Sequence, residues 1–301
     1  MNKLDPDILA SFHRDDVAAR IQAKGYALHV TGFLVSEDKS CQTYAEYTRA
    51  RCEAVGLRFS LVTATQANVA ELIKAANRDP GVHGIFVYYP IFGDARDSGI
   101  KDLVDPYKDV EGLCSHWMQK LYANERFDDP GRLHKCLLPC TPLAVLKLLE
   151  ETEAHSEVGL PFSGQTVSLF NRSDVVGKPL AHMLANDGAL VYSFDVDGGM
   201  AITRDDPSRQ AVERSQALRE SNVVITAVPS RHFEKIRADE LRPGAVCINI
   251  SSLQNFEEES KDKAGLYIPR VGPVTVAMCL RNALRLFEDH HLRPEAGHAP
   301  F

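Results

Sequence analysis

The sequence has no Cys-x-x-Cys pair and no long apolar run, and each absence excludes a class of protein. Its seven cysteines are scattered and odd in number, so we expect neither a disulfide framework nor a bound metal. Free thiols favour a reducing compartment, with the cytoplasm as the default. No apolar stretch approaches the roughly 20 residues needed to cross a bilayer. The N-terminus, MNKLDPDILASFHRDD, lacks the apolar segment of a signal peptide, so we expect no membrane association.

Positive charge is also in short supply. The 301 residues include 34 Lys and Arg against 41 Asp and Glu, which gives a formal net charge of -7. Nucleic acid is therefore not expected as a partner, because binding phosphates along a strand needs clustered positive charge. Hydrophobic residues make up 44% of the chain, enough for one or two globular cores.

The strict Gly-x-Gly-x-x-Gly fingerprint is absent, yet one stretch has the layout of a dinucleotide-binding unit. It reads in order as strand Val167–Phe170, polar turn Asn171–Asp174, helix Val175–Leu184 and strand Leu190–Phe194, followed by Asp195. Backbone N–H groups at the start of the helix would suit a pyrophosphate. An ordinary strand–helix–strand unit without a ligand is the alternative interpretation.

Asp195 bears on the choice of cofactor. A carboxylate at the end of the second strand can accept both ribose hydroxyls of NAD, and it would repel the additional 2′-phosphate of NADP. Arg172 lies in the preceding turn and could instead offer that phosphate a partner. We expect the effect of Asp195 to prevail.

Strands alternate with helices over the rest of the chain, which predicts an α/β fold. In the first half we expect helices at 5–23, 43–55, 66–77 and 143–151, and strands at 27–35, 59–62 and 84–89. In the second half we expect further strands at 222–228 and 245–250, an irregular segment at 268–276 and a last helix at 277–289.

Three loops carry residues suited to a ligand site. Tyr88 ends a buried strand, 108–112 reads KDVEG, and 271–275 reads VGPVT. Tyr44, Tyr47 and Tyr88 could stack on a flat heterocycle, and the acidic groups could face a developing cation. Each feature also has a plain structural explanation: tyrosines are commonly core residues, KDVEG could be a solvated turn, and Cys140 could be a small buried hydrophobe.

Four motifs together carry a family resemblance: PCTP at 139–142, NRSDVVGKPLA at 171–181, KDVEG, and VGPVTVAM at 271–278. The chain resembles the methylenetetrahydrofolate dehydrogenase/cyclohydrolase family over nearly its whole length. The resemblance implies two α/β domains flanking a cleft. Residues 1–152, joined by a C-terminal helix at 277–301, would bind folate. Residues 153–276 would form a Rossmann-type NAD-binding domain, through which the protein would be a homodimer.

Departures from the family pattern narrow the expected activity. Bifunctional members carry a lysine where this chain has Thr48 and a glutamine where it has Tyr88, and NADP-using members commonly offer neutral or basic groups where it has Asp195. This set resembles the monofunctional, NAD-dependent branch. A threonine hydroxyl cannot replace an ammonium group as proton donor, so we expect cyclohydrolase activity to be lost or very weak.

The resemblance implies oxidation of 5,10-methylenetetrahydrofolate to 5,10-methenyltetrahydrofolate with NAD, in one-carbon metabolism that supports purine biosynthesis. The alternatives are a bifunctional NADP-dependent enzyme, a catalytically silent dinucleotide-binding regulator and, less favoured, a hydroxy-acid dehydrogenase. The implied catalytic residues are Cys140, Tyr88, Thr48 and Glu111, and the implied substrate-binding residues are Tyr44, Asp109 and Pro273. The implied cofactor-binding residues are Asn171, Arg172, Ser173, Asp195, Val196, Val228, Pro229, Ser230, Ile250 and Thr275.

Overall fold

The computed structural model describes residues 4–204 and 211–292, which fall into two compact units. Among the described residues, the three-stranded unit comprises 11–119, 127–138 and 276–292, and the seven-stranded unit comprises 4–10, 120–126, 139–204 and 211–275. Both contain parallel sheets and helices, which confirms the predicted α/β class. Residues 139–152 group with the seven-stranded unit, whereas the sequence places them in the folate domain. The reason is that α6 (Cys140–Glu150) packs against α7 (Gly177–Asn186). The assignment of folate and NAD to the two stretches stays a prediction, as does the cleft.

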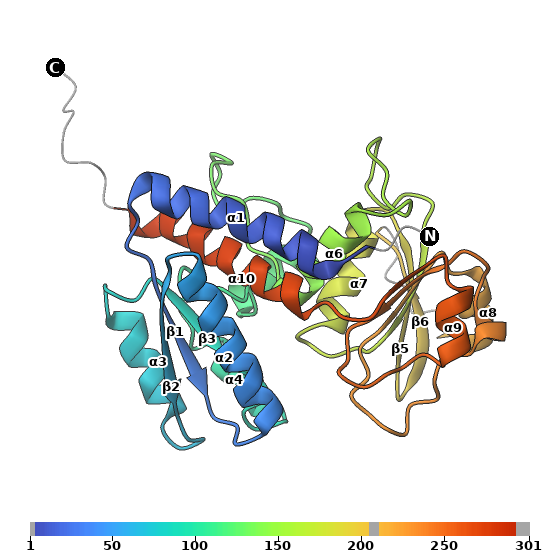
Figure 1. Ribbon diagram of the computed structural model, residues 1–301, viewed down its shortest axis with the longest axis horizontal. Coiled ribbons are helices and arrows are strands. Elements are labelled where there is room, and N and C mark those ends of the chain that lie inside the picture. Colours follow the sequence, from blue (N-terminus) through green and yellow to red (C-terminus); the bar gives the residue numbers. More distant parts are fainter. Residues whose placement is uncertain (1–3, 205–210, 293–301) are drawn as a thin grey trace. The chain divides into compact units, whose positions relative to one another are not determined.

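The three-stranded unit is built on a parallel sheet of strand order β2-β1-β3. Its strands are β1 (His29–Leu34), β2 (Arg58–Thr63) and β3 (Gly84–Val87). Helix α2 (Lys39–Ala54) connects β1 to β2, and α3 (Val69–Arg78) connects β2 to β3, on opposite faces of the sheet (Figure 1). The shorter α4 (Arg96–Lys101) follows, and α5 (Ser115–Tyr122) crosses from this unit into the other.

Strand alternation sends neighbouring side chains of β3 to different cores. Ile85 and Val87 join a cluster formed with α3 and α4, which includes Ile73. Phe86 points to the other face, where it lines a small cavity with residues of α2 and α10 (Gly272–Leu286). Since successive side chains in a strand alternate, Tyr88 continues on the Phe86 side. The two rings lie 4.6 Å apart between centroids.

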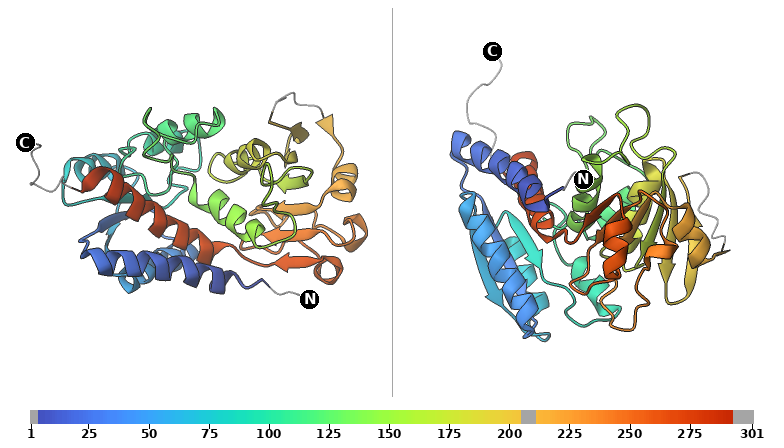
Figure 2. Two further views of the ribbon diagram at one scale, coloured as in Figure 1. Left: turned by 90° about the horizontal axis from the view of Figure 1, so that it is seen from above. Right: turned by 45° about the vertical axis from the view of Figure 1, so that its right-hand side comes forward.

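Helix α10 begins earlier than the sequence pattern predicts. The segment 268–276 was expected to be irregular, and this is wrong from Gly272 onward, because Pro273 lies in the first turn of α10, where a missing N–H costs nothing. A short π-helix, η2 (Phe287–His291), extends α10. Helix α1 (Pro6–Lys24) runs beside α10 in both views of Figure 2, and Arg20 forms an ion pair with Glu288. The rest of the predicted C-terminal helix, from 293, lies outside the described residues.

The seven-stranded sheet has the order β10-β9-β8-β4-β5-β6-β7. Its strands are β4 (Thr166–Phe170), β5 (Leu190–Asp195), β6 (Gly198–Ile202), β7 (Ala211–Val212), β8 (Val223–Thr226), β9 (Val246–Asn249) and β10 (Leu266–Ile268). All are parallel except β6 and β7, which pair antiparallel at one edge. The sequence pattern did not reveal these two strands. β6 follows β5 directly, because a tight turn at Val196 and Asp197 reverses the chain.

Helices cover both faces of this sheet: α6 and α7 lie on one face, and α8 (Arg214–Glu220) and α9 (Glu258–Lys263) lie on the other (Figure 1). The chain passes from β4 to β5 on one side, and later returns to place β8 on the other side of β4. Such a switch in strand order leaves a crevice at the carboxyl ends of the strands, where ligands bind in α/β sheets. Within the described residues, no helix is long and apolar enough to cross a membrane.

Candidate functional site

The fold brings most of the predicted cofactor residues to one edge of the seven-stranded sheet. They follow the carboxyl ends of four adjacent strands, β9, β8, β4 and β5. These residues are Asn171, Arg172 and Ser173 after β4, Asp195 and Val196 at β5, Val228, Pro229 and Ser230 after β8, and Ile250 after β9. Because β4 lies at the switch in strand order, this is the edge at which a dinucleotide is expected to bind.

The turn after β4 is held by its own polar groups. The Asn171 amide nitrogen donates to the Ala227 carbonyl at 3.0 Å, and its oxygen accepts the Ser173 N–H at 2.9 Å. Asn171 has a positive φ of 149°, an uncommon conformation for a residue with a side chain. Gly177, at the start of α7, packs so closely on this turn that a Cβ atom would lie 1.9 Å from the Asn171 carbonyl oxygen. Glycine at 177 therefore lets the helix N-terminus meet the turn directly.

Asp195 and Arg172 both contact the turn between β5 and β6, but the Asp195 carboxylate is exposed whereas the Arg172 guanidinium is enclosed. Asp195 ends β5 with its side chain exposed, and one carboxylate oxygen accepts the Val196 N–H at 2.8 Å. Arg172 is largely enclosed: its guanidinium donates to the carbonyls of Ser193 and Gly198 at 2.9 and 2.7 Å. It also forms an ion pair with Asp197, with 2.6 Å between the Nη1 nitrogen and a carboxylate oxygen. Val196 at the tip is fully exposed.

Two buried asparagines organise the ends of β8 and β9. Asn255 accepts the Val228 N–H and donates to the Val228 carbonyl, each at 3.1 Å. The Asn249 side-chain oxygen accepts from the Asn255 N–H at 3.0 Å and from the Thr226 hydroxyl at 3.2 Å. The Ile250 N–H, for its part, donates to the Thr226 carbonyl at 2.7 Å. This network fixes the backbone of two predicted cofactor segments.

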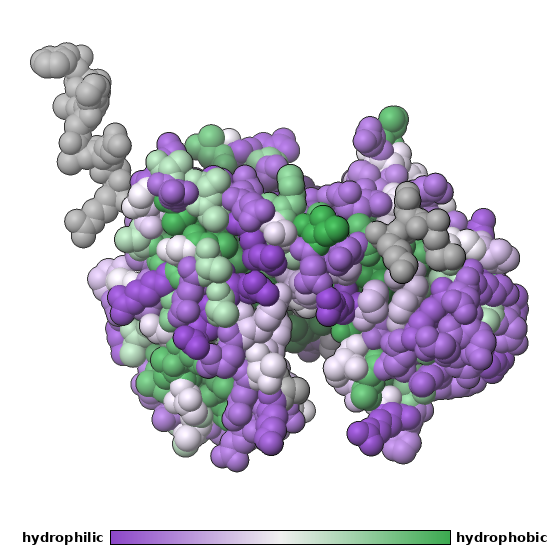
Figure 3. Space-filling model, viewed as in Figure 1, coloured by the Kyte–Doolittle hydropathy of each residue, from purple (hydrophilic) through white to green (hydrophobic). Residues whose placement is uncertain are grey.

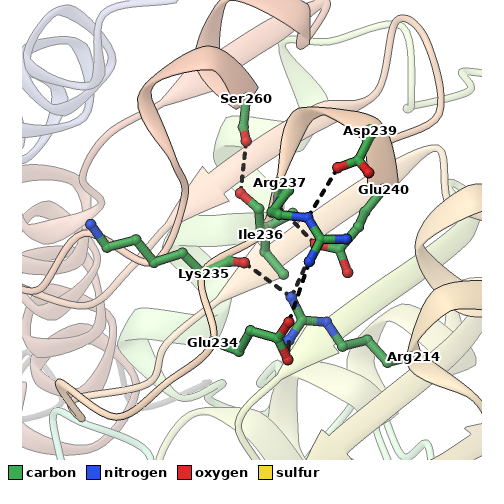
Figure 4. Close-up of polar contacts among 8 residues, drawn as sticks. All are labelled: Arg214, Glu234, Lys235, Ile236, Arg237, Asp239, Glu240 and Ser260. Atoms are coloured by element: carbon green, nitrogen blue, oxygen red, sulfur yellow. Dashed lines mark hydrogen bonds and ion pairs between the residues drawn. The ribbon is translucent and has the colours of Figure 1, made fainter.

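Charged residues anchor the loop that follows Ser230, as Figure 4 shows. Arg214 forms ion pairs with Glu234 and Glu240, both at 3.2 Å, and its guanidinium lies over the rings of Phe170 and Phe233. Ser260 in α9 donates to the Ile236 carbonyl at 2.7 Å, and Arg237 pairs with Asp239 at 3.1 Å. The surface over α8 and α9 is strongly hydrophilic (Figure 3). This network holds the loop from the side of α8 and α9.

The remaining predicted residues of the seven-stranded unit lie at two helix starts. Cys140 is the first residue of α6, is buried and forms no disulfide. Pro273 and Thr275 lie in the first turn of α10. The Thr275 hydroxyl reaches the hydroxyl of Thr141, next to Cys140, at 3.5 Å. The two motifs PCTP and VGPVT therefore meet, as one site would require.

In the three-stranded unit, Tyr88 and Thr48 share a buried, nearly apolar setting. Thr48 is 1% exposed, and its hydroxyl donates to the Tyr44 carbonyl one turn earlier at 2.9 Å. Thr48 and Cys52 line a cavity of about 10 Å³ under the sheet, with room for about one water molecule. Burial raises the pKa of Tyr88, and the nearby Thr48 hydroxyl offsets this only in part. Among the described residues, the Tyr88 hydroxyl has no hydrogen-bond partner of ordinary geometry.

Glu111 is the acidic group that faces this region. One of its carboxylate oxygens accepts the Val87 N–H at 3.0 Å, at the end of β3. Burial raises the pKa of Glu111 well above its usual range, and the charge of Asp109 adds to this effect. The Val87 N–H and the buried Lys101 ammonium act in the opposite direction. The ring of Tyr44 meets that of Tyr88 edge-on at 6.1 Å, so two of the three predicted stacking residues lie together. The ring of the third, Tyr47, lies under the Arg51 guanidinium at 4.8 Å.

The segment KDVEG is not a solvated turn, and that alternative is wrong. Lys108 is buried, and its ammonium donates to the carbonyls of Ala76, Asn77 and Asp79 at 3.0, 2.8 and 2.7 Å, which caps α3. Asp109 is buried, and its two oxygens accept four backbone N–H groups within residues 111–114. This geometry favours an organising role for Asp109. Its contact with substrate stays a prediction.

Several residues of these sites escaped the sequence reasoning. They are Lys101, Gly177, Asp197, Asn249 and Asn255. For Gly177, the signal was the single glycine after the polar turn, because a close approach of helix and turn needs one. The others give no local signal, since a polar residue in a loop or at a strand end is ordinary. Within 4–204 and 211–292, no cluster of His, Cys, Asp or Glu is placed to hold a metal ion.

Family models match both parts of the chain. Residues 4–111 match the catalytic domain of tetrahydrofolate dehydrogenase/cyclohydrolase, and residues 139–291 match the NAD(P)-binding domain of the same family. The chain belongs to the tetrahydrofolate dehydrogenase/cyclohydrolase family. The match confirms the resemblance carried by the four motifs, and it confirms a Rossmann-type domain in the C-terminal half.

Comparison with individual relatives shows which members of the family this chain is similar to. The chain is 38% identical to the methylenetetrahydrofolate dehydrogenase [NAD(+)] of Dictyostelium discoideum, over 95% of this chain and 94% of the relative. A solved structure, the NAD-dependent 5,10-methylenetetrahydrofolate dehydrogenase from Saccharomyces cerevisiae, matches with a TM-score of 0.89 and 35% identity, covering 96% and 97% of the two chains. A bifunctional protein FolD from Azoarcus is 30% identical over 93% of this chain and 94% of the relative.

Proposed function

We propose that the protein is an NAD-dependent methylenetetrahydrofolate dehydrogenase that oxidises 5,10-methylenetetrahydrofolate to 5,10-methenyltetrahydrofolate. The observation that carries the proposal is the exposed carboxylate of Asp195 at the end of β5, beside the turn after β4. A carboxylate at this place suits the two free hydroxyls of the NAD ribose. The names of the relatives from Dictyostelium and Saccharomyces support the same cofactor and substrate.

The residues at the strand ends fit a dinucleotide. Two hydrogen bonds of the Asn171 side chain hold the turn at Asn171–Ser173, and Gly177 lets α7 begin directly beside it. A helix N-terminus at this place suits a pyrophosphate. NAD, when bound, would accept the hydride at its nicotinamide ring. The protein's own contribution is to orient the two reactants and to exclude water.

Glu111 is proposed to balance the positive charge that develops on the folate. When hydride leaves the methylene bridge, the bridging nitrogens share a positive charge, and no proton has to be removed from carbon. A carboxylate in a buried setting interacts more strongly with such a charge than one in water does. Tyr44 would support the flat pterin ring, while Cys140, Asp109 and Pro273 remain proposed contacts.

Cyclohydrolase activity is proposed to be absent or very weak. Hydrolysis of the methenyl product needs a group that moves protons near neutral pH. The hydroxyl of Thr48 does not ionise near neutral pH, and it already donates its proton to the Tyr44 carbonyl in a hydrogen bond. Burial raises the pKa of the Tyr88 phenol further above neutral pH, so this hydroxyl cannot move protons there either. The apolar lining of the neighbouring cavity offers no substitute.

Three assays test this function. Reduction of NAD should require 5,10-methylenetetrahydrofolate and should be much faster than reduction of NADP under the same conditions. Added methenyltetrahydrofolate should disappear at the buffer rate. Equal kcat/KM for NAD and NADP would contradict the cofactor assignment, and rapid catalysed hydrolysis would support the bifunctional alternative. A protein that binds NAD but turns over no folate would be the silent regulator.

The wider setting is also proposed. We infer that the protein is a homodimer that acts in the cytoplasm, where its product supports purine biosynthesis. Cysteines that form no disulfide fit a reducing compartment. Light scattering at several concentrations tests the dimer, and cell fractionation tests the compartment.

A further inference from the structure

The ion pair between Arg172 and Asp197 crosses from the turn after β4 to the turn after β5. It joins two segments that meet beside the proposed adenosine ribose. Arg172 is the cation expected to bind the 2′-phosphate of NADP, since an arginine near this strand end binds that phosphate in dinucleotide-binding folds. What the guanidinium is bonded to therefore bears on cofactor choice.

The Arg172 guanidinium has five N–H donors, and four of them are engaged. Nε donates to the Ser193 hydroxyl at 3.4 Å, and Nη2 donates to the carbonyls of Ser193 and Gly198. Nη1 donates to the Asp197 carboxylate at 2.6 Å. Arg172 is 11% exposed on its side chain and Asp197 is 68% exposed. The carbonyls hold the guanidinium in place, while Asp197 covers its outer edge and neutralises its charge.

Asp195 is directly linked to this arrangement. In the β5–β6 ladder, Asp195 pairs with Gly198, whose carbonyl accepts from Arg172. The hairpin thus carries two carboxylates, Asp195 and Asp197, and the second of them is paired with the Arg172 guanidinium. A 2′-phosphate arriving here would meet the repulsion of Asp195, and the Arg172 charge that could offset it is already paired with Asp197.

We propose that Asp197 is a second determinant of NAD specificity, which acts by occupying Arg172. This inference rests on the proposed function. Asp195 would repel the 2′-phosphate, and Asp197 would occupy the guanidinium of Arg172, which could otherwise bind that phosphate. Replacing Asp197 would leave the guanidinium anchored by the two carbonyls, with its Nη1 edge and its full charge available.

The test compares Asp197→Asn, which keeps the size and removes the charge, with Asp239→Asn. Asp239 is 75% exposed and also pairs with an arginine, Arg237, in the same unit. The charge change is identical, so the control accounts for net charge. Asp197→Asn should raise the ratio of kcat/KM for NADP to that for NAD by about tenfold, the lower end of what one charge-assisted hydrogen bond contributes. Asp239→Asn should leave the ratio unchanged.

A binding measurement gives a readout that does not depend on turnover. By calorimetry, Asp197→Asn should bind adenosine 2′,5′-bisphosphate about tenfold more tightly relative to adenosine 5′-monophosphate. Adding Arg172→Gln should abolish the gain. An unchanged ratio in Asp197→Asn, an equal gain in Asp239→Asn, or a gain that survives Arg172→Gln would each overturn the proposal. A wild-type protein without folate oxidation would refute the proposed function alone, because nucleotide binding would still test Asp197.

Discussion

The two units build their parts of the proposed site by opposite means. In the three-stranded unit, the important groups are buried, and burial sets their chemistry: the pKa of both Glu111 and Tyr88 is raised mainly by loss of water. In the seven-stranded unit, the turn after β4 is held by the side-chain amide of Asn171, and two exposed carboxylates, Asp195 and Asp197, follow β5, the second of them paired with the enclosed Arg172. Substitutions that introduce or unpair a charge at a buried site lower the stability of the fold strongly, because a buried charge without a partner costs free energy. Exposed pairs are worth little to stability and can be exchanged.

The largest expected effect comes from forcing a charge into the buried unit. Thr48→Lys should destabilise the protein by about 3–4 kcal/mol, because it leaves an unpaired ammonium in an apolar cavity. It should not create cyclohydrolase activity, because Tyr88 stands beside the position. Urea unfolding and the loss of methenyltetrahydrofolate measure the two outcomes.

Thr43→Lys is the matched control for this substitution. Thr43 lies on the same helix, its hydroxyl also donates to a carbonyl one turn earlier, but its side chain is exposed. It should change stability by less than about 0.5 kcal/mol. Equal destabilisation by both variants would show that burial at Thr48 is not the cause.

Gly177→Ala tests the close packing of α7 on the turn after β4 in the seven-stranded unit. The new Cβ would collide with the Asn171 carbonyl, so we expect a loss of about 3 kcal/mol in stability and weaker NAD binding. Gly99→Ala is the control, because a Cβ at that exposed helical glycine meets no atom within 4 Å. It should be neutral or slightly stabilising. Thermal unfolding and NAD titration check both, and a harmless Gly177→Ala would show that the turn can move.

Glu111→Gln removes the charge of this half-buried carboxylate while keeping the shape of the side chain. We expect kcat/KM for the folate to fall about 100-fold, comparable to the loss of one preorganised electrostatic contact, with little change in the KM for NAD. Because the pKa of Glu111 is raised, the wild-type rate should fall as pH falls through that pKa, and this limb should vanish in the variant. A variant with full activity would remove Glu111 from the mechanism.

The smallest expected effect is a change of stability with pH, and it concerns His83, which immediately precedes β3 in the three-stranded unit. Burial lowers the pKa of His83, as do the charges of His291, His29 and Lys108, with Asp79 opposing them. The folded state thus binds the proton less readily than the unfolded state does, so the stability contributed at neutral pH is lost as pH falls below about 6.5. Urea midpoints at several pH values should decline in this direction, and less steeply for His83→Gln. A midpoint independent of pH would contradict this.

Much of the fold could be predicted, because β-branched runs and helical periodicity are local signals. All three strands of the first sheet and the strands β4, β5, β8 and β9 lie within or close to their predicted ranges. The hairpin of β6 and β7 escaped because its sequence is rich in glycine and short of β-branched residues. The start of α10 escaped because Gly272 and Pro273 suggest a loop, although both are tolerated in a first helical turn.

The candidate site divides in the same way. Which residue types stand at the strand ends was readable from motifs, and so was the loss of a proton-carrying side chain at Thr48. The roles of Asp109 and Lys108 were not readable, because the same carboxylate or ammonium serves a ligand or a backbone turn equally well. Only the four N–H groups around Asp109 and the three carbonyls around Lys108 distinguish these uses.

The sequence by itself determined the α/β class, most of the parallel strands, the family, and the carboxylate that closes β5, since these depend on side-chain pattern along the chain. Tertiary structure alone decided that Arg172 is occupied by Asp197 and that Tyr88 lies against Thr48 without a hydrogen-bond partner of ordinary geometry among the described residues. The physical reason is that charge and solvation depend on neighbours in space. Sheet register and strand alternation place those neighbours, and no short stretch of sequence contains both members of either pair.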